Sequence, residues 1–378
     1  MTSRTVRLRD FDPILMLTAL CLVALGALLI YSGTLNQFGP PSASDFSHPV
    51  VRQAAFAGAG LLLALVLARL DYGHLGTVSG GLYIAGVAAL ALVLVFGEEA
   101  FGSTRWIDVA GTRVQPSEIA KLFVIISLAK YLADRQDTVR TLRVFLTSLA
   151  MVAIPAALVL AEPDLGSAII FGAIWLGIVT VAGANWRHLA GLFGAALVSA
   201  PFLLLGLQGY QRERIELWLD PERDPLGGGF NILQAQISVG SGGIFGKGLT
   251  EGTQTQLDYL RTETTDFIFS VLGEELGFIG AMVLFALFVV FLLRTLRVAE
   301  LSRDLFGRLI ATGVAVFILL QTFINVAVNI GMLPVTGIPL PFISQGGSSL
   351  ITLFVAIGIL QSILLRHRPF SFRNFYDG

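Results

Sequence analysis

The sequence predicts an all-α polytopic membrane protein with about ten transmembrane helices. Its 378 residues are 54% hydrophobic and only 13% charged, against roughly 25% charged in an average soluble domain. The mean hydropathy is +0.77. A run of about 20 apolar residues is long enough to cross a bilayer as a helix, and such runs use up the chain. We therefore expect residues 1–378 to form a single membrane domain.

The expected spans follow the apolar runs in order. The first begins near Pro13 and is not followed by the small-residue pattern of a signal-peptide cleavage site, so we expect it to be retained. The predicted spans are 13–34, 50–70, 78–97, 116–133, 143–161, 164–183, 187–206, 266–293, 307–331 and 349–366.

The distribution of Lys and Arg predicts the orientation. One set of loops carries sixteen of these residues and the other carries eight, with Lys121 inside a span. Positive loops face the cytoplasm, so both termini are expected there. The outer loops are then 98–115, about 207–265, and 332–348. Loops of this length usually carry function or are disordered, so we expect the active surface on the outer side.

Several other functions find no support in the sequence. A net charge of −1 gives no signal for nucleic-acid binding, and four scattered histidines lack zinc-site spacing. There is no GxSxG, P-loop or dinucleotide-binding pattern, and no internal repeat typical of a transporter. The outer stretch "GGGFNILQAQISVGSGGIFGKG" predicts a short amphipathic element at the interface. Its glycines and Lys247 give only a weak phosphate-binding signal.

Polar residues at membrane depth are functional candidates by default. Glu118 and Lys121 are three residues apart, so they share a helix face and can form an ion pair. That pair could fix packing or serve function, and spacing alone leaves both open. In "AEPDLGS" we expect Asp164 to cap the sixth span.

A second polar series lies on the ninth span. Gln321, Asn325 and Asn329 are spaced four residues apart, so they lie along one helix face. This spacing favours interhelical hydrogen bonds, with the wall of a polar cavity as the alternative.

The stretch "TETTDFIFSVLGEELG" places three acids at the start of the eighth span. On a helical wheel Ser270 lies within about 40° of Asp266 and Glu274 within about 80°, roughly 12 Å along the axis. Glu275 points to the opposite side. The three residues Asp266, Ser270 and Glu274 could therefore face one polar cavity. Spacing alone favours the simpler alternative, in which Asp266 stabilises the positive end of a helix.

Six blocks of sequence carry a family resemblance across about 245 residues. They are "RWIDVAGTRVQPSEIAK", "EPDLGS", "YQRERIELWLDPERDPLGGGFNILQAQISVGSGGIFGKG", "GTQTQLDYL", "TDFIFSVLGEELGFIG" and "GIPLPFISQGGSS". In this order the blocks resemble the SEDS family, the shape, elongation, division and sporulation glycosyltransferases of bacteria. Two of them, "LDPERDPLGGGFN" and "GTQTQLDYL", are more similar to the elongation members than to the division members. The ten-helix architecture that the resemblance implies agrees with the count of apolar runs.

The resemblance implies an activity in peptidoglycan synthesis. Family members polymerise lipid II into glycan strands outside the cytoplasmic membrane and release undecaprenyl pyrophosphate. The chemistry needs a base near the acceptor hydroxyl and positive charge near the departing pyrophosphate. The aspartate of the family's "TDFIF" block is Asp266 here, which the resemblance assigns as the essential acid and general base.

The resemblance also suggests which residues meet the substrate. Arginine suits bidentate phosphate contact, and basic residues near the outer side are candidates for the pyrophosphate, whereas a solvated loop is the simpler account of Arg212 and Arg214. A divalent cation, Mg²⁺ or Mn²⁺, could also neutralise the leaving group, but the sequence gives no ligand set, and Asp266 and Glu274 are only candidates. The candidates for substrate contact are Arg105, Lys121, Arg212, Arg214, Lys247, Glu118, Glu274 and Ser344.

Two departures from the family pattern affect the finer roles. "LRT" at Leu260–Thr262 stands where relatives commonly have "LPE", and Gln345 replaces the tyrosine of "ISYGGSS". If that tyrosine stacks on a sugar, Gln345 must hydrogen-bond instead.

Two other functions remain alternatives. Polar residues at membrane depth would also suit a transporter that flips lipid II, and a third alternative is a non-catalytic scaffold for a transpeptidase. The resemblance implies a class B penicillin-binding protein and other membrane proteins of the elongation machinery as partners.

Overall fold

The computed structural model describes residues 11–42, 45–100, 103–109, 112–205, 209–225, 227–257, 259–260 and 264–367. Arg261 and Thr262 of the departure at "LRT" lie outside these residues. So do six of the arginines counted for the orientation: Arg4, Arg7, Arg9, Arg261, Arg368 and Arg373.

A helix occupies each of the ten predicted spans. Seven of these helices are long and apolar enough to cross a membrane, so the chain is an integral membrane protein, while the full count of ten crossings and the side of the termini remain predictions. The helices are α1 (Pro13–Phe38), α2 (Pro49–Arg69), α3 (Gly73–Phe96), α4 (Pro116–Ala133), α5 (Leu142–Ala161), α6 (Leu165–Val181), α7 (Trp186–Leu205), α11 (Ile268–Leu301), α12 (Leu305–Asn329) and α13 (Gly347–Leu364).

The helices begin where the sequence supplies a cap or a proline. Proline stands in the first turn of α1, α2 and α4, where its missing N–H group costs nothing. The carboxylates of Asp12, Asp164 and Asp304 accept backbone N–H groups at the starts of α1, α6 and α12. The predicted cap at Asp164 is confirmed.

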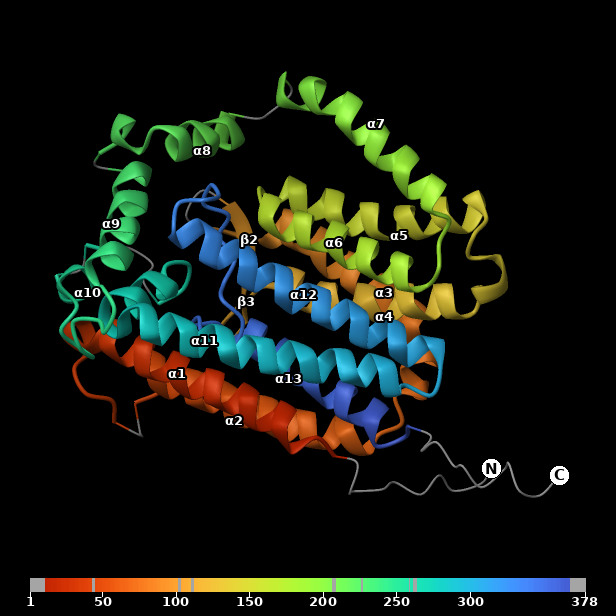
Figure 1. Cartoon of the computed structure of the whole chain (residues 1–378), viewed down its shortest axis with the longest axis horizontal. Coiled ribbons are helices and arrows are strands. Elements are labelled where there is room, and N and C mark those ends of the chain that lie inside the picture. The colour runs from red at the N-terminus through yellow and green to blue at the C-terminus, as the bar shows by residue number, and fades with distance from the viewer. Residues whose placement is uncertain are drawn as a thin grey trace.

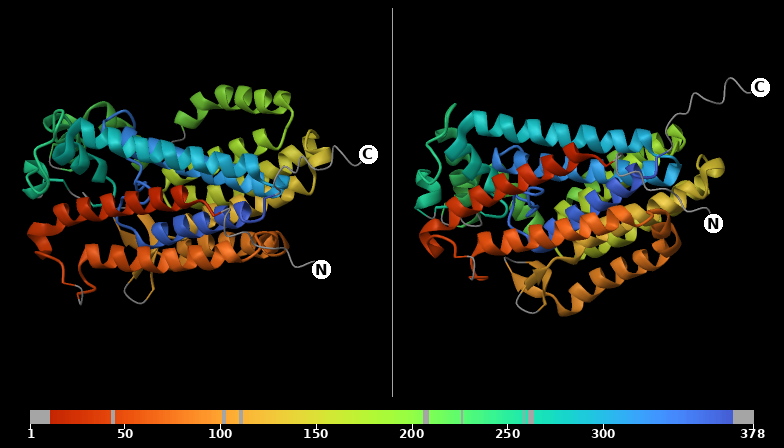
Figure 2. Two further views of the ribbon diagram at one scale, coloured as in Figure 1. Left: turned by 60° about the horizontal axis from the view of Figure 1, so that its bottom comes forward. Right: turned by 90° about the horizontal axis from the view of Figure 1, so that it is seen from below.

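The long helices run side by side in a bundle (Figure 1). Along their apolar stretches, 78% of α12 and of α13 is buried, against 17% of α2 and 22% of α3. The first pair therefore forms the interior, and the second pair presents most of its surface outward. In Figure 1, α7 and α8 lie above the bundle, and the left view of Figure 2 also sets α7 apart from it.

Two predicted loops contain regular structure. Residues 98–115 form a small antiparallel sheet, β1 (Glu98–Ala100), β2 (Ser103–Val109) and β3 (Thr112–Val114), in the order β1-β2-β3. This sheet departs from the all-α expectation. The segment after α7 folds into α8 (Gly209–Leu219), α9 (Gly228–Ser241) and α10 (Thr253–Gln256), joined in part by the 3₁₀ turn η3 (Pro221–Arg223). The predicted amphipathic element is thus largely α9, and a second 3₁₀ turn, η2 (Gln136–Thr138), follows α4.

Helix α11 is broken at Gly277, and residues 243–248 fill the break. Gly277 has φ +63° and ψ −159°, a conformation that only glycine adopts readily. The freed N–H groups of Phe278 and Ile279 donate to the carbonyls of Gly243 and Ile244. In return, the N–H groups of residues 247 and 248 donate to the carbonyls of Glu274 and Glu275. The glycine-rich stretch "GGIFGKG" therefore completes the backbone hydrogen bonds of a helix.

We expect Gly277→Ala to destabilise the protein because a Cβ there would lie 2.3 Å from the Gly246 nitrogen in a strained backbone conformation. The cost should be about 1–3 kcal/mol or more, seen as a lower melting temperature in detergent. Gly80→Ala is the matched control, since an added Cβ on this exposed α3 glycine meets nothing within 4 Å. Equal melting temperatures for the two variants would contradict the assigned break.

Candidate active site

Asp266 lies in a turn before α11. The helix begins at Ile268 and residues 264–267 form the turn that leads into it. The helical wheel that placed Asp266, Ser270 and Glu274 on one face is therefore wrong, because Asp266 does not have helical backbone. Asp266 lies directly before Phe267, the residue that precedes the first turn of α11, so the simpler alternative, in which its charge stabilises the positive end of the helix, remains a prediction.

Three successive backbone carbonyls fix this turn. The carbonyl of Thr264 accepts the N–H group of Gln345 at 2.8 Å. The carbonyl of Thr265 accepts the hydroxyl of Ser344 at 2.6 Å. The carbonyl of Asp266 accepts the side-chain amides of two α12 residues, as described below. The backbone is thus held by α12 and by the loop at 330–346, while the carboxylate takes no part.

The carboxylate of Asp266 is left available for a ligand. Within the described residues it accepts no hydrogen bond and forms no ion pair, and the residue is only partly buried. Removal from water raises the pKa of Asp266 to about 6, and nearby Asp164 adds to the rise, while Arg105 and Arg214 oppose it. Such a carboxylate is mostly ionised at neutral pH but more basic than an ordinary aspartate.

Two arginines reach the same region from different elements. Arg105, on β2, donates to the carbonyl of Pro163 at 3.2 Å and lies 3.8 Å from the Asp164 carboxylate. Arg214, on α8, donates to the carbonyl of Val335 at 3.2 Å. The small sheet and α8 therefore bring two guanidinium groups toward the Asp266 turn. Arg105 and Arg214 are the predicted substrate contacts whose charges act on the Asp266 carboxylate and lower its pKa.

The "EPDLGS" turn adds two more acids. Asp164 accepts the Ser167 N–H group at 3.0 Å and is fully buried beside Arg105. Glu162 is also fully buried, and neither of its carboxyl oxygens has a hydrogen-bond partner among the described residues. Burial raises the pKa of Glu162 to about 8, with the Asp164 charge adding to the rise and Arg105 opposing it. Glu162 therefore holds a proton at neutral pH. Its burial was not foreseen from the sequence.

Glu118 and Lys121 form the predicted ion pair deep in the bundle. Lys121 Nζ lies 2.6 Å from Glu118 Oε1, and neither side chain is more than 1% exposed. Lys121 also donates to Gln321 at 3.3 Å and lies 4.7 Å from the centre of the Phe317 ring. Ser349 of α13 donates to the other Glu118 oxygen at 3.3 Å. These contacts link α4, α12 and α13, so the ion pair stabilises the packing of these three helices.

Glu274 and Lys247 bind one another. The Glu274 carboxylate accepts Lys247 Nζ at 2.7 Å, the backbone N–H groups of Gln254 and Thr255, and the hydroxyls of Thr253 and Thr255. A carboxylate with five donors is fully occupied. Together they tie the 247–255 segment to α11. That Glu274 shares a cavity with Asp266 stays a prediction, whereas Glu275, as expected, packs elsewhere, against Ser32 of α1.

Two further candidates have structural partners. Arg212 on α8 is paired with Glu216 at 2.8 Å, and its side chain is 75% exposed, which agrees with the solvated-loop account. Ser344 holds the Thr265 carbonyl and accepts the Leu340 N–H group at 2.8 Å, so it supports the Asp266 turn. The described residues contain no group of three or more His, Cys, Asp or Glu side chains arranged for a metal ion.

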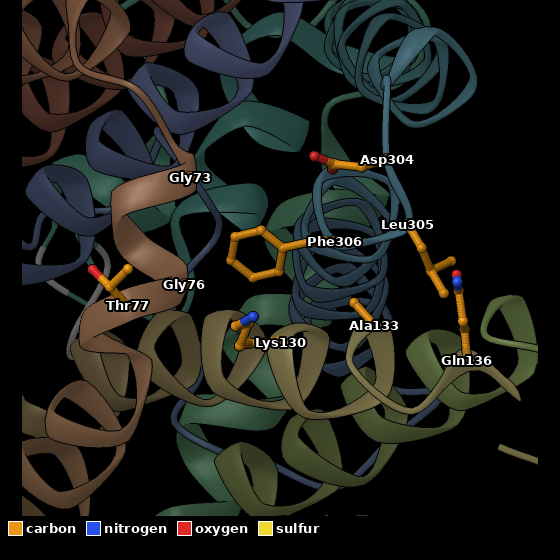
Figure 3. A pocket seen from close by; sticks show the side chains of 9 residues that line it. All are labelled: Gly73, Gly76, Thr77, Lys130, Ala133, Gln136, Asp304, Leu305 and Phe306. Carbon is orange, nitrogen blue, oxygen red and sulfur yellow. The ribbon is translucent and has the colours of Figure 1, made fainter. Parts of the chain in front are cut away.

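A separate cavity of about 280 Å³ lies at the other end of α11 (Figure 3). It opens between the first turns of α3 and α12 and the last turn of α4. Its polar side chains are Thr77, Lys130, Gln136 and Asp304. The length of α11 separates it from Asp266, so it belongs to a different site.

Comparison with known proteins decides the family. The model of the FtsW, RodA and SpoVE family, described as cell cycle proteins, matches residues 13–368. The chain belongs to this family. It is the SEDS family that the sequence blocks resemble, so that prediction is confirmed.

The relatives cover nearly the whole chain. It is 36% identical over 365 residues to the peptidoglycan glycosyltransferase MrdB of Escherichia coli K12, covering 95% of each. It is 37% identical to a probable peptidoglycan glycosyltransferase FtsW of Trichlorobacter lovleyi, covering 94% of each. Members of both branches are thus similarly close in identity.

Solved SEDS structures have the same fold. A chain from a peptidoglycan synthase complex that coordinates polymerization and crosslinking matches with a TM-score of 0.79 at 33% identity, covering 97% of this chain and 99% of that one. The crystal structure of Thermus thermophilus RodA matches with a TM-score of 0.67 at 30% identity, covering 97% and 98%.

We expect Glu162→Gln to stabilise the protein at neutral and alkaline pH. The native state keeps the Glu162 proton up to a pKa of about 8, whereas the unfolded chain loses it near pH 4.5. The wild type therefore loses stability as the pH rises between these values, and the neutral glutamine removes that loss. Melting temperatures measured from pH 5 to 9 should diverge by about 2–4 °C. Parallel curves would contradict a protonated Glu162.

Proposed function

We infer that this SEDS protein is a peptidoglycan glycosyltransferase that polymerises lipid II into glycan strands. The observation that carries the inference is the Asp266 carboxylate, which has no hydrogen-bond partner in the described part of the chain although its turn is fixed and two arginines stand nearby. Several relatives over the full length are named peptidoglycan glycosyltransferases. A fixed, unpartnered base beside cationic groups suits the attack of a sugar hydroxyl on a lipid diphosphate.

The proposed step transfers a glycan unit with inversion at one carbon. The C4 hydroxyl of the acceptor N-acetylglucosamine attacks the anomeric carbon of the lipid-linked N-acetylmuramic acid, and Asp266 accepts the hydroxyl proton. The new bond joins the acceptor oxygen to the anomeric carbon. The bond from that carbon to the phosphate oxygen breaks, and the electron pair leaves with undecaprenyl pyrophosphate. Arg105 and Arg214 neutralise charge that develops on the diphosphate.

We propose a divalent cation only as an ion that is bound to the substrate diphosphate. The described donors do not fit a resident metal site, since no cluster of three suitable side chains occurs among them. A Mg²⁺ or Mn²⁺ ion would therefore be brought by the diphosphate oxygens, which are its preferred ligands.

The setting of the reaction follows from the orientation of the loops. The end of the bundle that carries α9 and α10 is also where α11 begins, just after Asp266 (Figure 1), and the excess of Lys and Arg in the opposite loops favours the outer side for this end. There the head group would meet the site while its polyprenyl chain remains among the helices.

A transpeptidase partner is the proposed companion. A similar chain comes from a complex that coordinates polymerization with crosslinking, which supports pairing of this chain with a class B penicillin-binding protein. Other membrane proteins of the elongation machinery would then join through that complex.

We expect Asp266→Asn to lower polymerisation by about 10²–10⁴-fold, the usual worth of a general base. The assay supplies purified protein with labelled lipid II, with and without its partner and Mg²⁺, and separates the glycan products by length. For the wild type the rate should fall about tenfold per pH unit below a pKa of about 6.

Other outcomes distinguish the alternatives. Long strands made by Asp266→Asn would remove Asp266 as the base. Lipid movement across vesicles without polymer would favour a flippase. The absence of both polymerisation and lipid movement would favour a scaffold.

We expect Arg214→Ala to lower kcat/KM by about 10–100-fold, because charged hydrogen bonds to a diphosphate are worth about 1.5–3 kcal/mol. Arg212→Ala is the matched control, since it removes the same side chain two residues away on α8, where it is exposed and paired with Glu216. That variant should stay within about twofold of the wild type. Equal losses would show that α8 acts through its total charge.

A further inference from the structure

Asn329 makes four close hydrogen bonds around the Asp266 turn. Its amide nitrogen donates to the carbonyl of Asp266 at 2.9 Å and to that of Asn325 at 2.9 Å. Its amide oxygen accepts both the N–H group and the hydroxyl of Ser270, at 3.0 and 2.7 Å. The residue is fully buried, and its donors and acceptors are all used. One α12 side chain thus contacts the backbone on both sides of the start of α11.

Asn325 supports the same carbonyl one helical turn earlier. Its amide nitrogen donates to the Asp266 carbonyl at 3.0 Å and to the Ile338 carbonyl at 2.8 Å. The Asp266 carbonyl therefore accepts two hydrogen bonds, which fill both of its lone pairs. Asn325 also links the turn to the loop at 330–346. The two amides thus join the Asp266 turn to α12 and to the loop that follows α12.

We propose that Asn329, assisted by Asn325, is a positioning residue that sets the place of the Asp266 carboxylate in the glycosyl transfer. The proposal rests on the proposed function. Since the carboxylate itself has no hydrogen-bond partner in the described residues, the hydrogen bonds that hold its backbone largely set where it lies. A misplacement of about 1 Å can cost about 100-fold in rate. The hydrogen bonds to the Asp266 carbonyl therefore position the carboxylate, as a direct hydrogen bond would, but leave its oxygens free to accept a proton.

The chain supplies a matched buried amide that holds backbone away from the site. Gln361 of α13 is fully buried, donates to the Asp12 carbonyl at 2.7 Å and accepts the Asp12 N–H group at 2.9 Å. It fixes the start of α1 at the opposite end of the bundle. Removing either amide leaves buried backbone groups unpaired at a similar cost, but only Asn329 is tied to Asp266.

The test compares Asn329→Ala with Gln361→Ala in the lipid II assay. Both variants should melt at similarly lowered temperatures. Asn329→Ala should lower kcat by about 10–100-fold with KM within about twofold, because the base is misplaced while the substrate contacts remain. Gln361→Ala should keep the wild-type kcat. Ser270→Ala, which removes one bond to Asn329 and spares the other, provides a milder variant with an expected loss of about two- to fivefold.

The pH profile gives a second readout. A loosened turn lets water reach the carboxylate, so the acid limb in Asn329→Ala should move from about 6 toward the ordinary value near 4. The charged groups facing Asp266 are Arg105 from β2, Arg214 from α8 and Asp164 from the α5–α6 turn. All three are unchanged in this variant.

Failure of the proposal and failure of the proposed function give different results. Equal losses of kcat in Asn329→Ala and Gln361→Ala, with an unmoved acid limb, would overturn the positioning role while Asp266→Asn still abolished activity. Full activity of Asp266→Asn would overturn the base assignment itself. If Asn329→Ala does not fold, Ser270→Ala decides: a wild-type kcat and acid limb in that variant would count against the proposal.

Discussion

The structure depends on pairing every backbone polar group that lies within the apolar bundle. Lipid offers no hydrogen bonds, so non-helical backbone at membrane depth is stable only where protein groups satisfy it. Among the described residues, two non-helical segments packed against the bundle meet this requirement, the break in α11 at Gly277 and the loop at 330–346. Residues 243–248 pair the first, and buried amide and hydroxyl side chains pair the second.

This requirement explains why so many polar residues lie inside the molecule without meeting substrate. Glu274 collects five donors from the 247–255 segment, and Gln321 holds the Pro339 carbonyl at 2.9 Å. Each such residue replaces hydrogen bonds that a regular helix would make for itself. Their common role is to let irregular backbone enter the bundle and bring the Asp266 turn to a fixed place.

Much of the fold could be predicted from the sequence, because it rests on local signals. Apolar runs located the ten helices, and the aspartate of "EPDLGS" was recognised as a cap. The pair of Glu118 and Lys121 followed from helical spacing alone. These features need only neighbours within one or two turns, and neighbours along the chain are visible in the sequence.

The parts that escaped prediction depend on long-range contacts. The hydropathy of α11 is continuous across Gly277, so the run gave no sign of the break, and Asp266 was assigned to a helix that begins two residues later. Lys247 was matched to a phosphate because its partner Glu274, 27 residues away, could not be inferred. The four-residue spacing of Asn325 and Asn329 predicted interhelical hydrogen bonds. Only the structure shows that their shared acceptor is the carbonyl of Asp266.

The charge balance around Asp266 completes the physical account of the site. With Glu162 protonated at neutral pH, the carboxylates of Asp266 and Asp164 face the guanidinium groups of Arg105 and Arg214, two charges against two. On the proposed function, a diphosphate that binds the arginines takes over part of their positive field. Asp266 then loses the interaction that opposes the rise in its pKa, so it becomes a stronger base when the substrate is in place. Binding of the diphosphate leaving group to the two arginines would thus raise the pKa of Asp266, the base that accepts the proton of the acceptor hydroxyl.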